Sequence, residues 1–493
     1  MTAFENLMAF QHTTEALSMV AERLGWDQET VMPRGATEQR SEEMAAMEGV
    51  LHARRTDPRL ADWLANAEAP DAAGARAISL IRHSFLRSAA VPATLAEEIA
   101  RTTSLAQGIW AEARAKNDVA HFLPTLKRVV ALRREEGEAM AAAGVGGGDT
   151  YDALIDGYEP GASAASLAAM FSAMRPRLVA LREAVLGAPT PKALSRNFDA
   201  EGQLALARRA ATAFGYDWTR GRLDLAVHPF SSGGVNDSRI TTRVVENEPF
   251  NCLYSTIHEV GHSSYELAID AAHHFTPLGH GVSMGVHESQ SRIYENQLGR
   301  SRAFTSWLFT QMQAQFGDIG LADADAFYAA VNAVRPGYIR TEADELQYNL
   351  HVMLRFDLER AMIGGSLEVE DIEEAWNTRF LADFGFAVDK PAHGVLQDVH
   401  WSVGAIGYFA TYSLGNVYAG CLNRAMRQAL PDLDASLAEG SARPAAAWLR
   451  ENVQRYGSLL TPTEVITNAC GHAPTEEPLL DYLEGKFREL YAL

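Results

Sequence analysis

Hydrophobic residues recur every three or four positions along most of this chain, which is the period of an amphipathic helix. Residues 3–25 show the pattern first, and Gly25 and Trp26 are expected to end that helix. Further helices are predicted from the same period, at about 36–54, 58–67, 71–90, 93–115, 118–143, 151–158, 163–186, 199–215, 282–315, 322–333, 340–363, 369–383, 403–429, 444–456, 462–470 and 475–491. The chain is therefore predicted to be mainly α-helical.

The helical period gives way once to the alternation that is typical of strands. Residues 223–227 and 240–245 alternate and contain β-branched side chains. They bracket a polar, glycine-containing loop over residues 228–237. The sequence therefore predicts one small antiparallel sheet, directly before the segment that carries the chemistry.

That segment reads as a helix and contains His258, Glu259 and His262 in the spacing His-Glu-x-x-His. Residues four apart lie on the same face of a helix, so the two imidazoles can converge on one point. Glu259 lies roughly 100° round the helix from His258, beside that point rather than at it. Two ligands with a neighbouring carboxylate are typical of a metal-dependent hydrolase. Two ordinary histidines are the alternative, but the apolar side of this helix predicts burial, and buried imidazoles need partners.

A third metal ligand is expected, and spacing alone does not identify it. Glu266 continues the histidine face, but each four-residue step advances about 6 Å, so it is expected behind the site or at the surface. The metzincin extension is absent, because Tyr265 and Ala268 stand where it needs glycine and histidine. Glu288 suits a ligand from a neighbouring helix, oriented by Arg292, although a surface ion pair of these two residues is an equal alternative. The downstream candidates are Asp270, His273, His274, His280, His287 and Glu288.

Composition and charge narrow the class of protein. Hydrophobic residues make up 47% and charged residues 22%, as in soluble globular proteins. The net charge of −20 argues against a nucleic-acid surface, because phosphate binding requires a basic face. Three widely spaced cysteines suggest no disulfide framework, so a reducing, cytoplasmic location is expected. No secretory signal and no membrane-spanning stretch is recognisable, so we expect no membrane association.

Several motifs in order resemble the carboxypeptidase Taq family of metallocarboxypeptidases, almost from end to end. They are Leu24–Thr30 with Met32-Pro33, His228-Pro229-Phe230, Asp237–Arg243, His258–His262, His287–Arg292, Ile339–Glu345 and Gly394–Trp401. Such a series is far more specific than one His-Glu-x-x-His.

The resemblance implies an elongated, mainly helical fold with a deep groove, like that of the neurolysin and angiotensin-converting-enzyme peptidases. The small predicted sheet would lie beside the metal site. Residues 1–493 would form one catalytic domain, with two helical lobes flanking the groove. One divalent metal per chain, zinc or alternatively cobalt, would be held by His258, His262 and Glu288. The resemblance also implies release of single C-terminal residues from peptides with broad specificity, and a homodimer.

Catalytic roles are expected for further residues. Glu259 would accept a proton from water and pass it to the leaving amine. Tyr408, Tyr412 and His400 are candidate donors to the developing oxyanion, although most tyrosines serve packing. Asp398 is expected to orient a histidine or an arginine that the sequence does not identify.

An exopeptidase must also bind the terminal carboxylate of its substrate. Arg340 is the first candidate, because a guanidinium offers paired donors in one plane; a helix pair with Asp344 is the alternative. His228 is expected either to contact substrate or to be packed and hydrogen-bonded. Arg239 is expected to pair with Asp237 and shape the edge of the groove, with substrate contact as its second role.

The sequence is compatible with two other functions. A neurolysin-like oligopeptidase would share the metal site and cut within short peptides, and a role of Arg340 in binding the C-terminus would distinguish the two. A helical scaffold that binds peptides without hydrolysis is a third reading, against which Glu259 argues.

Overall fold

The computed structural model describes residues 1–493 and is mainly helical, with 68% of residues in helices and 3% in strands, so the predicted fold class is confirmed. The chain folds into two compact units, each built from three stretches. Unit 1 comprises residues 1–85, 191–333 and 415–474, and unit 2 comprises residues 86–190, 334–414 and 475–493. No helix is both long enough and apolar enough to cross a membrane.

The helices of unit 1 are numbered in chain order. They are α1 (Ala3–Thr30), α2 (Thr37–Arg55), α3 (Arg59–Asn66), α9 (Ala200–Ala213), α10 (Pro249–Ala268), α11 (Met284–Arg292), α12 (Arg302–Phe316), α13 (Ala324–Val331), α17 (Leu433–Ala438), α18 (Arg443–Asn452) and α19 (Pro462–Cys470). A π-helix, Ile293–Gly299, continues directly from α11. Helices α4 (Ala72–Ala90) and α16 (Ala410–Ala429) begin in one unit and end in the other.

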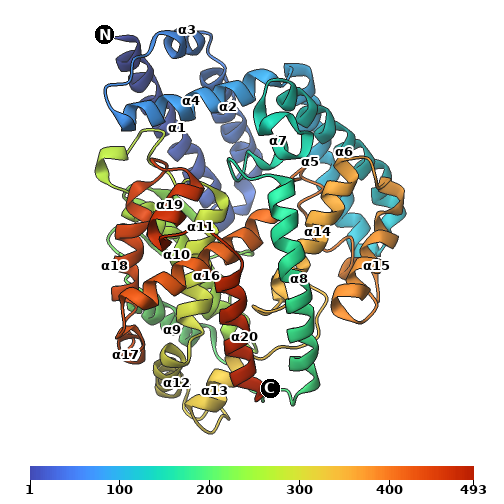
Figure 1. The fold of residues 1–493 in the computed structure, drawn as a ribbon, viewed down its shortest axis with the longest axis vertical. Helices are drawn as coiled ribbons and strands as arrows, with labels where there is room; N and C mark the ends of the chain where they lie inside the picture. The colour runs from blue at the N-terminus through green and yellow to red at the C-terminus, as the bar shows by residue number, and fades with distance from the viewer. The chain divides into compact units, whose positions relative to one another are not determined.

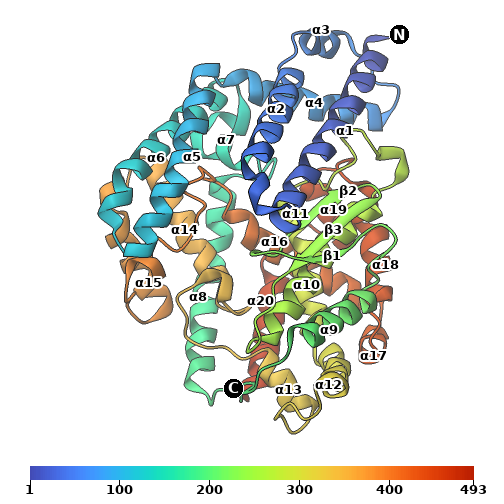
Figure 2. The same cartoon turned by 180° about the vertical axis from the view of Figure 1, so that it is seen from behind.

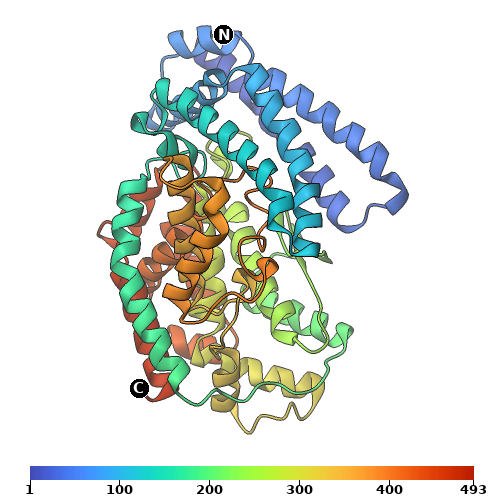
Figure 3. The ribbon, with the colours of Figure 1, turned by 90° about the vertical axis from the view of Figure 1, so that its right-hand side faces the viewer.

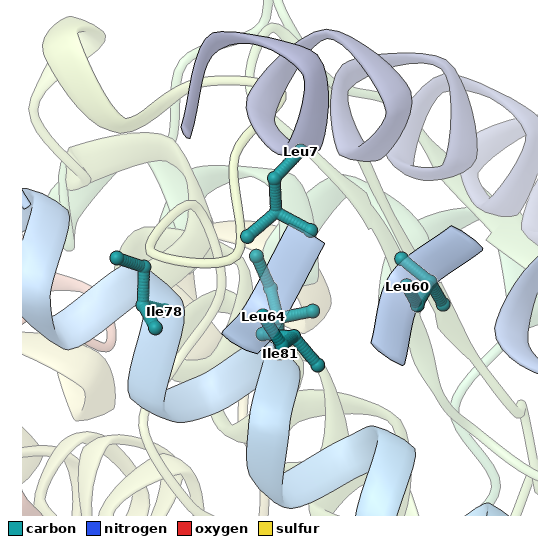
Figure 4. Close-up of a cluster of buried hydrophobic side chains, with 5 residues drawn as sticks. All are labelled: Leu7, Leu60, Leu64, Ile78 and Ile81. Carbon is teal, nitrogen blue, oxygen red and sulfur yellow. The ribbon is translucent and has the colours of Figure 1, made fainter. Parts of the chain in front are cut away.

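The N-terminal helices of unit 1 pack around a small apolar cluster. Leu7 from α1 meets Leu60 and Leu64 from α3 and Ile78 and Ile81 from α4, and all five are buried (Figure 4). Their helical spacing places them on one face of each helix, so burying that face joins the three helices.

Helix α1 runs five residues further than predicted, to Thr30. Trp26 is buried, with the guanidinium of Arg239 4.2 Å and that of Arg222 5.0 Å from its ring. These tertiary contacts stabilise helical backbone that Gly25 alone would weaken.

The sheet of unit 1 differs from the prediction in its topology. It has three strands, β1 (Leu223–Leu225), β2 (Ser231–Gly234) and β3 (Asp237–Thr242), in the order β1-β3-β2. The two predicted strands pair in parallel, and β2, which arises inside the predicted loop, pairs antiparallel to β3. The expected antiparallel pairing of β1 with β3 was wrong: the strand that pairs antiparallel is β2, whose Ser-Ser-Gly-Gly sequence carries no strand signal of its own. Figure 2 shows the sheet packed on α10.

Unit 2 is built from α5 (Ala93–Lys116), α6 (Val119–Ala142), α7 (Thr150–Ile155), α8 (Ala164–Gly187), α14 (Tyr348–Ile363), α15 (Ile372–Phe384) and α20 (Glu477–Tyr491). Helices α5 and α6 form a hairpin (Figure 3), and α8 lies beside α20 (Figure 1). Arg177 on α8 donates to Glu477 and Glu484, and these contacts connect the last helix to the unit.

Other helix boundaries were also wrong. Residues 340–347 form a short 3-10 turn and a second turn instead of helix, because the Asp344 carboxylate accepts from the amides of Leu346 and Gln347 just before α14. Helix α16 begins at Ala410 rather than near residue 403, and α17 was missed. The helical region over 282–315, which was expected to be interrupted near its start, is divided into α11, the π-helix and α12, with its break at residues 300 and 301.

Candidate active site

His258 and His262 lie one turn apart on α10, as the spacing predicted, and Glu288 reaches them from α11. The Nε2 atom of His262 lies 3.3 Å from Oε2 of Glu288, and Nε2 of His258 lies 3.6 Å from the same oxygen. One potential ligand atom from each residue lies within 4.8 Å of the other two. Two imidazoles and a carboxylate at this separation are the donor set of many catalytic zinc sites, so the residues fit a divalent cation.

The close approach of α10 and α11 depends on Gly261, between the two histidines. A Cβ atom at this position would lie 2.5 Å from Cα of Ser291 and 2.6 Å from the carbonyl oxygen of Gln290. Only glycine allows the backbones to approach this closely, and this approach delivers Glu288 to the histidines.

His258 is held from behind by a carboxylate. Its Nδ1 atom donates to Oε2 of Glu295 at 2.9 Å, which leaves Nε2 facing Glu288. Glu295 lies in the π-helix, a conformation frequent at functional sites. Burial alone would raise the pKa of Glu295, but the hydrogen bond from His258 and the charges of Arg292 and Arg300 lower it to about 2.

His262 is held by a second histidine instead. Its Nδ1 atom lies 2.6 Å from Nδ1 of His287, whose Nε2 atom donates to Oε1 of Glu266 at 3.0 Å. When His287 is neutral, its Nδ1 atom must accept, so the proton of His262 is on Nδ1 and the lone pair of Nε2 faces the site. Burial lowers the pKa of His262 to about 4, which keeps that lone pair available. Glu266 therefore lies behind the site, one of the two positions expected for it.

Glu288 is fixed by Arg292, whose Nε atom donates to Oε1 at 2.6 Å. Glu288 is buried and Arg292 is largely buried, with side-chain exposed fractions of 9% and 13%, so the surface ion-pair alternative was wrong. Burial would raise the pKa of Glu288, but Arg292 and the two histidines hold it well below its usual range. The carboxylate is therefore charged, as a metal ligand must be.

Glu259 is buried and accepts no hydrogen bond from the protein. Burial raises its pKa to about 7, and the neighbouring charges of Glu288 and Glu295 add to the shift, while His258 opposes it. A carboxylate with this pKa can both accept and release a proton near neutrality.

The candidates for carboxylate binding belong to unit 2, where Asp398 joins two arginines. Arg340 donates from Nε and Nη2 to Asp398 at 3.1 and 2.9 Å, and from Nη1 to the hydroxyl of Tyr348 at 3.1 Å. Arg355 donates from Nε to the other oxygen of Asp398 at 2.6 Å. The alternative pair of Arg340 with Asp344 was wrong, because Arg340 pairs with Asp398, and Asp344 accepts from the amides of Leu346 and Gln347. Asp398, whose partner the sequence left open, orients both arginines.

The three oxyanion candidates form an aromatic cluster in unit 2. The ring of Tyr408 lies 5.1 Å from that of Tyr412 and 5.8 Å from that of His400. Nε2 of His400 lies 3.4 Å from the hydroxyl of Tyr412. Burial, followed by the charges of Arg340 and Arg355, lowers the pKa of His400 to about 4, so its imidazole is neutral at pH 7.

The two candidates near the sheet differ in their surroundings. Arg239 donates from Nε and Nη2 to both oxygens of Asp237, at 2.7 and 2.9 Å, as its predicted ion pair requires. His228 is exposed in the loop between β1 and β2, so the packed alternative for it was wrong.

The comparisons with known proteins agree along the whole chain. The sequence profile of the family described as carboxypeptidase Taq (M32) metallopeptidase matches residues 6–487. The chain belongs to this family. Thermostable carboxypeptidase 1 of Thermus thermophilus is 40% identical over 505 residues, covering 99% of both chains, and carboxypeptidase 1 of Bacillus subtilis is 33% identical over 502 residues, covering 99% of this chain and 98% of that protein.

Two solved structures show the same fold. The M32 carboxypeptidase from Deinococcus radiodurans has a TM-score of 0.95 at 39% identity, with complete coverage of both chains. Metallocarboxypeptidase 1 of Trypanosoma cruzi has a TM-score of 0.95 at 33% identity, with 99% of both chains covered. The protein is thus a metallocarboxypeptidase, a peptide hydrolase whose family uses a divalent metal and acts on peptides.

The residues that support the two histidines were not predicted from the sequence. Glu295 was not singled out, although it lies seven residues, or two helical turns, after Glu288. His287 was considered only as a ligand, and its position behind His262 was not foreseen. Two other ligand candidates pair elsewhere: Asp270 accepts from Arg455, and His280 pairs with Glu15.

Proposed function

We propose that this metallocarboxypeptidase releases single C-terminal residues from peptides with broad specificity. His258, His262 and Glu288 would hold one zinc ion, and Glu259 would act as the general base. The observation that carries the proposal is that one potential ligand atom from each of these three residues lies within 4.8 Å of the other two. Beside them lies the buried carboxylate of Glu259, which accepts no hydrogen bond from the protein.

A divalent cation bound to these residues supplies Lewis-acid chemistry, which lowers the pKa of a water and polarises the scissile carbonyl. The chain's own residues do the rest. Glu295 and His287 fix the orientation of the two imidazoles. Glu259, which has no competing hydrogen bond, takes the proton of the attacking water and returns it to the leaving amine.

The test compares the metal-loaded enzyme with a Glu259→Gln variant on one unstructured peptide, supplied as free acid and as C-terminal amide. We expect a ladder of products that lose one C-terminal residue at a time, from the free acid only. Glu259→Gln should retain its metal and lose about 100-fold or more in kcat. Internal fragments from both peptides would instead establish the neurolysin-like alternative, and no hydrolysis by the metal-loaded enzyme would leave a peptide-binding scaffold.

The choice of zinc rests on the donor set, because two imidazoles and one carboxylate suit zinc, although cobalt accepts the same ligands. Metal analysis of the purified enzyme, followed by chelation and add-back of each ion, tests it. Zinc as the bound ion and as the ion that restores activity is expected. Restoration by cobalt alone would reject zinc.

We propose that Arg340 binds the terminal carboxylate of the substrate. Two buried guanidinium groups share the single carboxylate of Asp398, so this cluster carries excess positive charge. A second carboxylate would compensate that charge, and the substrate's C-terminus provides one.

An Arg340→Gln variant should lose most of its preference for the free-acid peptide over the amide, mainly through a higher KM. Arg379→Gln is the matched control, because Arg379 also lies in unit 2 and pairs with Asp357 and Asp383. An unchanged preference in Arg340→Gln would reject the assignment.

Smaller roles are proposed for five further residues. Tyr408, Tyr412 and His400 would donate to the oxyanion, so phenylalanine in place of either tyrosine should lower kcat more than it raises KM. His228 is exposed and would contact substrate. Arg239 donates from Nε and Nη2 to the two oxygens of Asp237, and this bidentate pair supports a structural role over substrate contact.

The assembly and location are also proposals. The family resemblance supports a homodimer, which light scattering should report as twice the mass of one chain. Three free cysteines suit a cytoplasmic protein, and cell fractionation would test this. We propose that the two units act together as one catalytic domain.

A further inference from the structure

Unit 1 contains a pocket whose lining includes none of the proposed metal ligands. Its volume is about 650 Å³, within the range of small-molecule sites. The side chains that define it come from α9, from the segment between α9 and β1, from α12, and from the stretch between the end of α17 and the first residue of α18. They are Arg208, Arg209, Trp218, Trp307, Glu439 and Arg443.

The pocket is basic in a strongly acidic protein. Three arginines face a single carboxylate, that of Glu439, whereas the whole chain has a net charge of −20. None of the three forms an ion pair: Arg208 donates to the carbonyl of Leu223, and Arg209 donates to the amide oxygen of Gln315. The Nε atom of Arg209 is buried without a hydrogen-bond partner. Three arginines without an ion pair thus line one pocket, and their positive charge would attract an anion.

Two indole rings form the apolar part of the same pocket. Trp218 is half-buried and is held by a hydrogen bond from Nε1 to Thr212 at 3.0 Å, with the guanidinium of Arg208 5.1 Å from its ring. Trp307 lies against Gly440, where a Cβ atom would come within 2.3 Å of the indole. Gly440 has a φ of +79°, so glycine is required there both by its backbone and by the ring. The segment that contains Gly440 therefore packs directly against the indole of Trp307, and the rings of Trp218 and Trp307 form the aromatic wall of the pocket.

Helix α18 adds a third feature, because it begins at Arg443 in the pocket and has no side-chain cap. The helix is ten residues long, and its N-terminus carries the positive end of the helix dipole. The backbone amide of Arg443 can donate to an anion there, whereas Pro444, the next residue, has no amide hydrogen.

We propose that this pocket binds a small ligand that carries both a phosphate and a planar aromatic ring, of the size of a nucleoside monophosphate. The three guanidinium groups and the start of α18 would bind the phosphate, and the ring would stack on an indole. A metal cation is unsuited to a site with three positive charges. A simple anion would leave the aromatic wall unused.

Titration calorimetry with adenosine monophosphate, adenosine and inorganic phosphate tests the proposal on the metal-loaded enzyme. We expect saturable binding of adenosine monophosphate at one site per chain, about tenfold or more tighter than either half alone. An Arg208→Gln/Arg443→Gln double variant should lose about tenfold or more in affinity. Arg450→Gln is the matched control, since Arg450 is also exposed on α18 but lies outside the pocket.

Four results would overturn the proposal: no saturable binding at millimolar concentrations, equal affinity in the double variant, equal loss in Arg450→Gln, or phosphate binding as tightly as the nucleotide. The second result would place the ligand elsewhere, for example at the metal. An acidic peptide that binds more tightly than the nucleotide, and loses affinity in the same double variant, would replace the proposal with a peptide site. Retained peptide hydrolysis by the double variant would show that it folds, so a loss of binding cannot be attributed to unfolding.

Discussion

The orientation of each histidine in the candidate site depends on one residue behind it. His258 donates directly to the Glu295 carboxylate, whereas His262 reaches Glu266 only through His287. In both cases the bond at Nδ1 fixes the ring and leaves Nε2 toward Glu288. Such supporting contacts raise the affinity of a metal site because the ligands are already oriented before the ion binds.

Replacing Glu295 by glutamine should weaken metal binding by about 10- to 100-fold. The amide keeps the shape of the side chain but removes the charge that holds His258, Arg292 and Arg300. Competition with a chelator measures the affinity. Glu48→Gln, at an exposed position on α2, is the control and should bind metal as the unchanged enzyme does. An unaltered affinity in Glu295→Gln would show that this carboxylate does not orient His258.

Asp398 is the only carboxylate that pairs with Arg340 and Arg355 in unit 2. An Asp398→Asn variant would leave two buried guanidinium groups without a counter-charge, and it should destabilise the protein by about 3–5 kcal/mol. Denaturant unfolding measures the loss. Asp62→Asn, exposed on α3, should change stability by less than about 1 kcal/mol. A similar small effect in both variants would mean that another group compensates the arginines.

At the scale of elements, the site is made by the crossing of α10 and α11. The two backbones approach at Gly261, and this contact brings the Glu288 carboxylate to within 3.3 Å of His262. The sheet packs against α10 as well, so this helix is supported by β-structure and by α11. The metal helix thus depends on tertiary contacts more than on its own propensity.

A Gly261→Ala substitution should separate these helices. The added methyl group would overlap Ser291 and Gln290, so we expect a loss of about 1–3 kcal/mol in stability together with weaker metal binding. Gly108→Ala on α5 is the matched control, because a Cβ atom there meets nothing within 4 Å; it should gain about 0.5–1 kcal/mol. Thermal unfolding and chelator competition report the two effects. Full metal affinity in Gly261→Ala would contradict the role of this contact.

At the scale of the whole molecule, unit 1 assembles segments that are far apart in the chain. His280, in the segment between α10 and α11, lies 2.7 Å from Glu15 on α1. Burial alone would lower the pKa of His280, but the bond to Glu15 and the charges of Glu266 and Glu22 raise it to about 9. The contact therefore connects the N-terminal helix to the segment that leads into α11, and its strength depends on pH.

A His280→Gln variant should reveal this pH dependence in its melting temperature. Since the pKa of the histidine is higher in the folded than in the unfolded protein, its stabilisation is complete below about pH 6.5 and disappears as the pH rises through about 9. We expect a difference in Tm of about 2 °C at pH 6, kept small because the imidazole is 39% exposed, and almost none at pH 9.5. His52→Gln, exposed on α2, should show a constant offset. A constant offset for His280→Gln as well would exclude the ion pair.

The amino-acid sequence by itself determined the local features of this protein. The helical period placed most helices within a few residues, since amphipathic faces must be buried wherever the chain folds. The four-residue spacing of His258 and His262 fixed their common face, because helix geometry is local. The series of motifs indicated the family, which the comparisons confirmed.

Only the tertiary structure decided how the strands pair, where α1 ends and which residues support the metal ligands. The parallel pairing of β1 with β3 depends on a strand with no propensity of its own, and α1 continues past Gly25 because Trp26 is buried. The contacts of Glu295 with His258, of His287 with His262 and of two arginines with Asp398 are found only in three dimensions, since the partners lie on different elements. Long-range contacts of this kind are set by packing and charge compensation across the fold, to which a local pattern of hydrophobic and polar residues is insensitive.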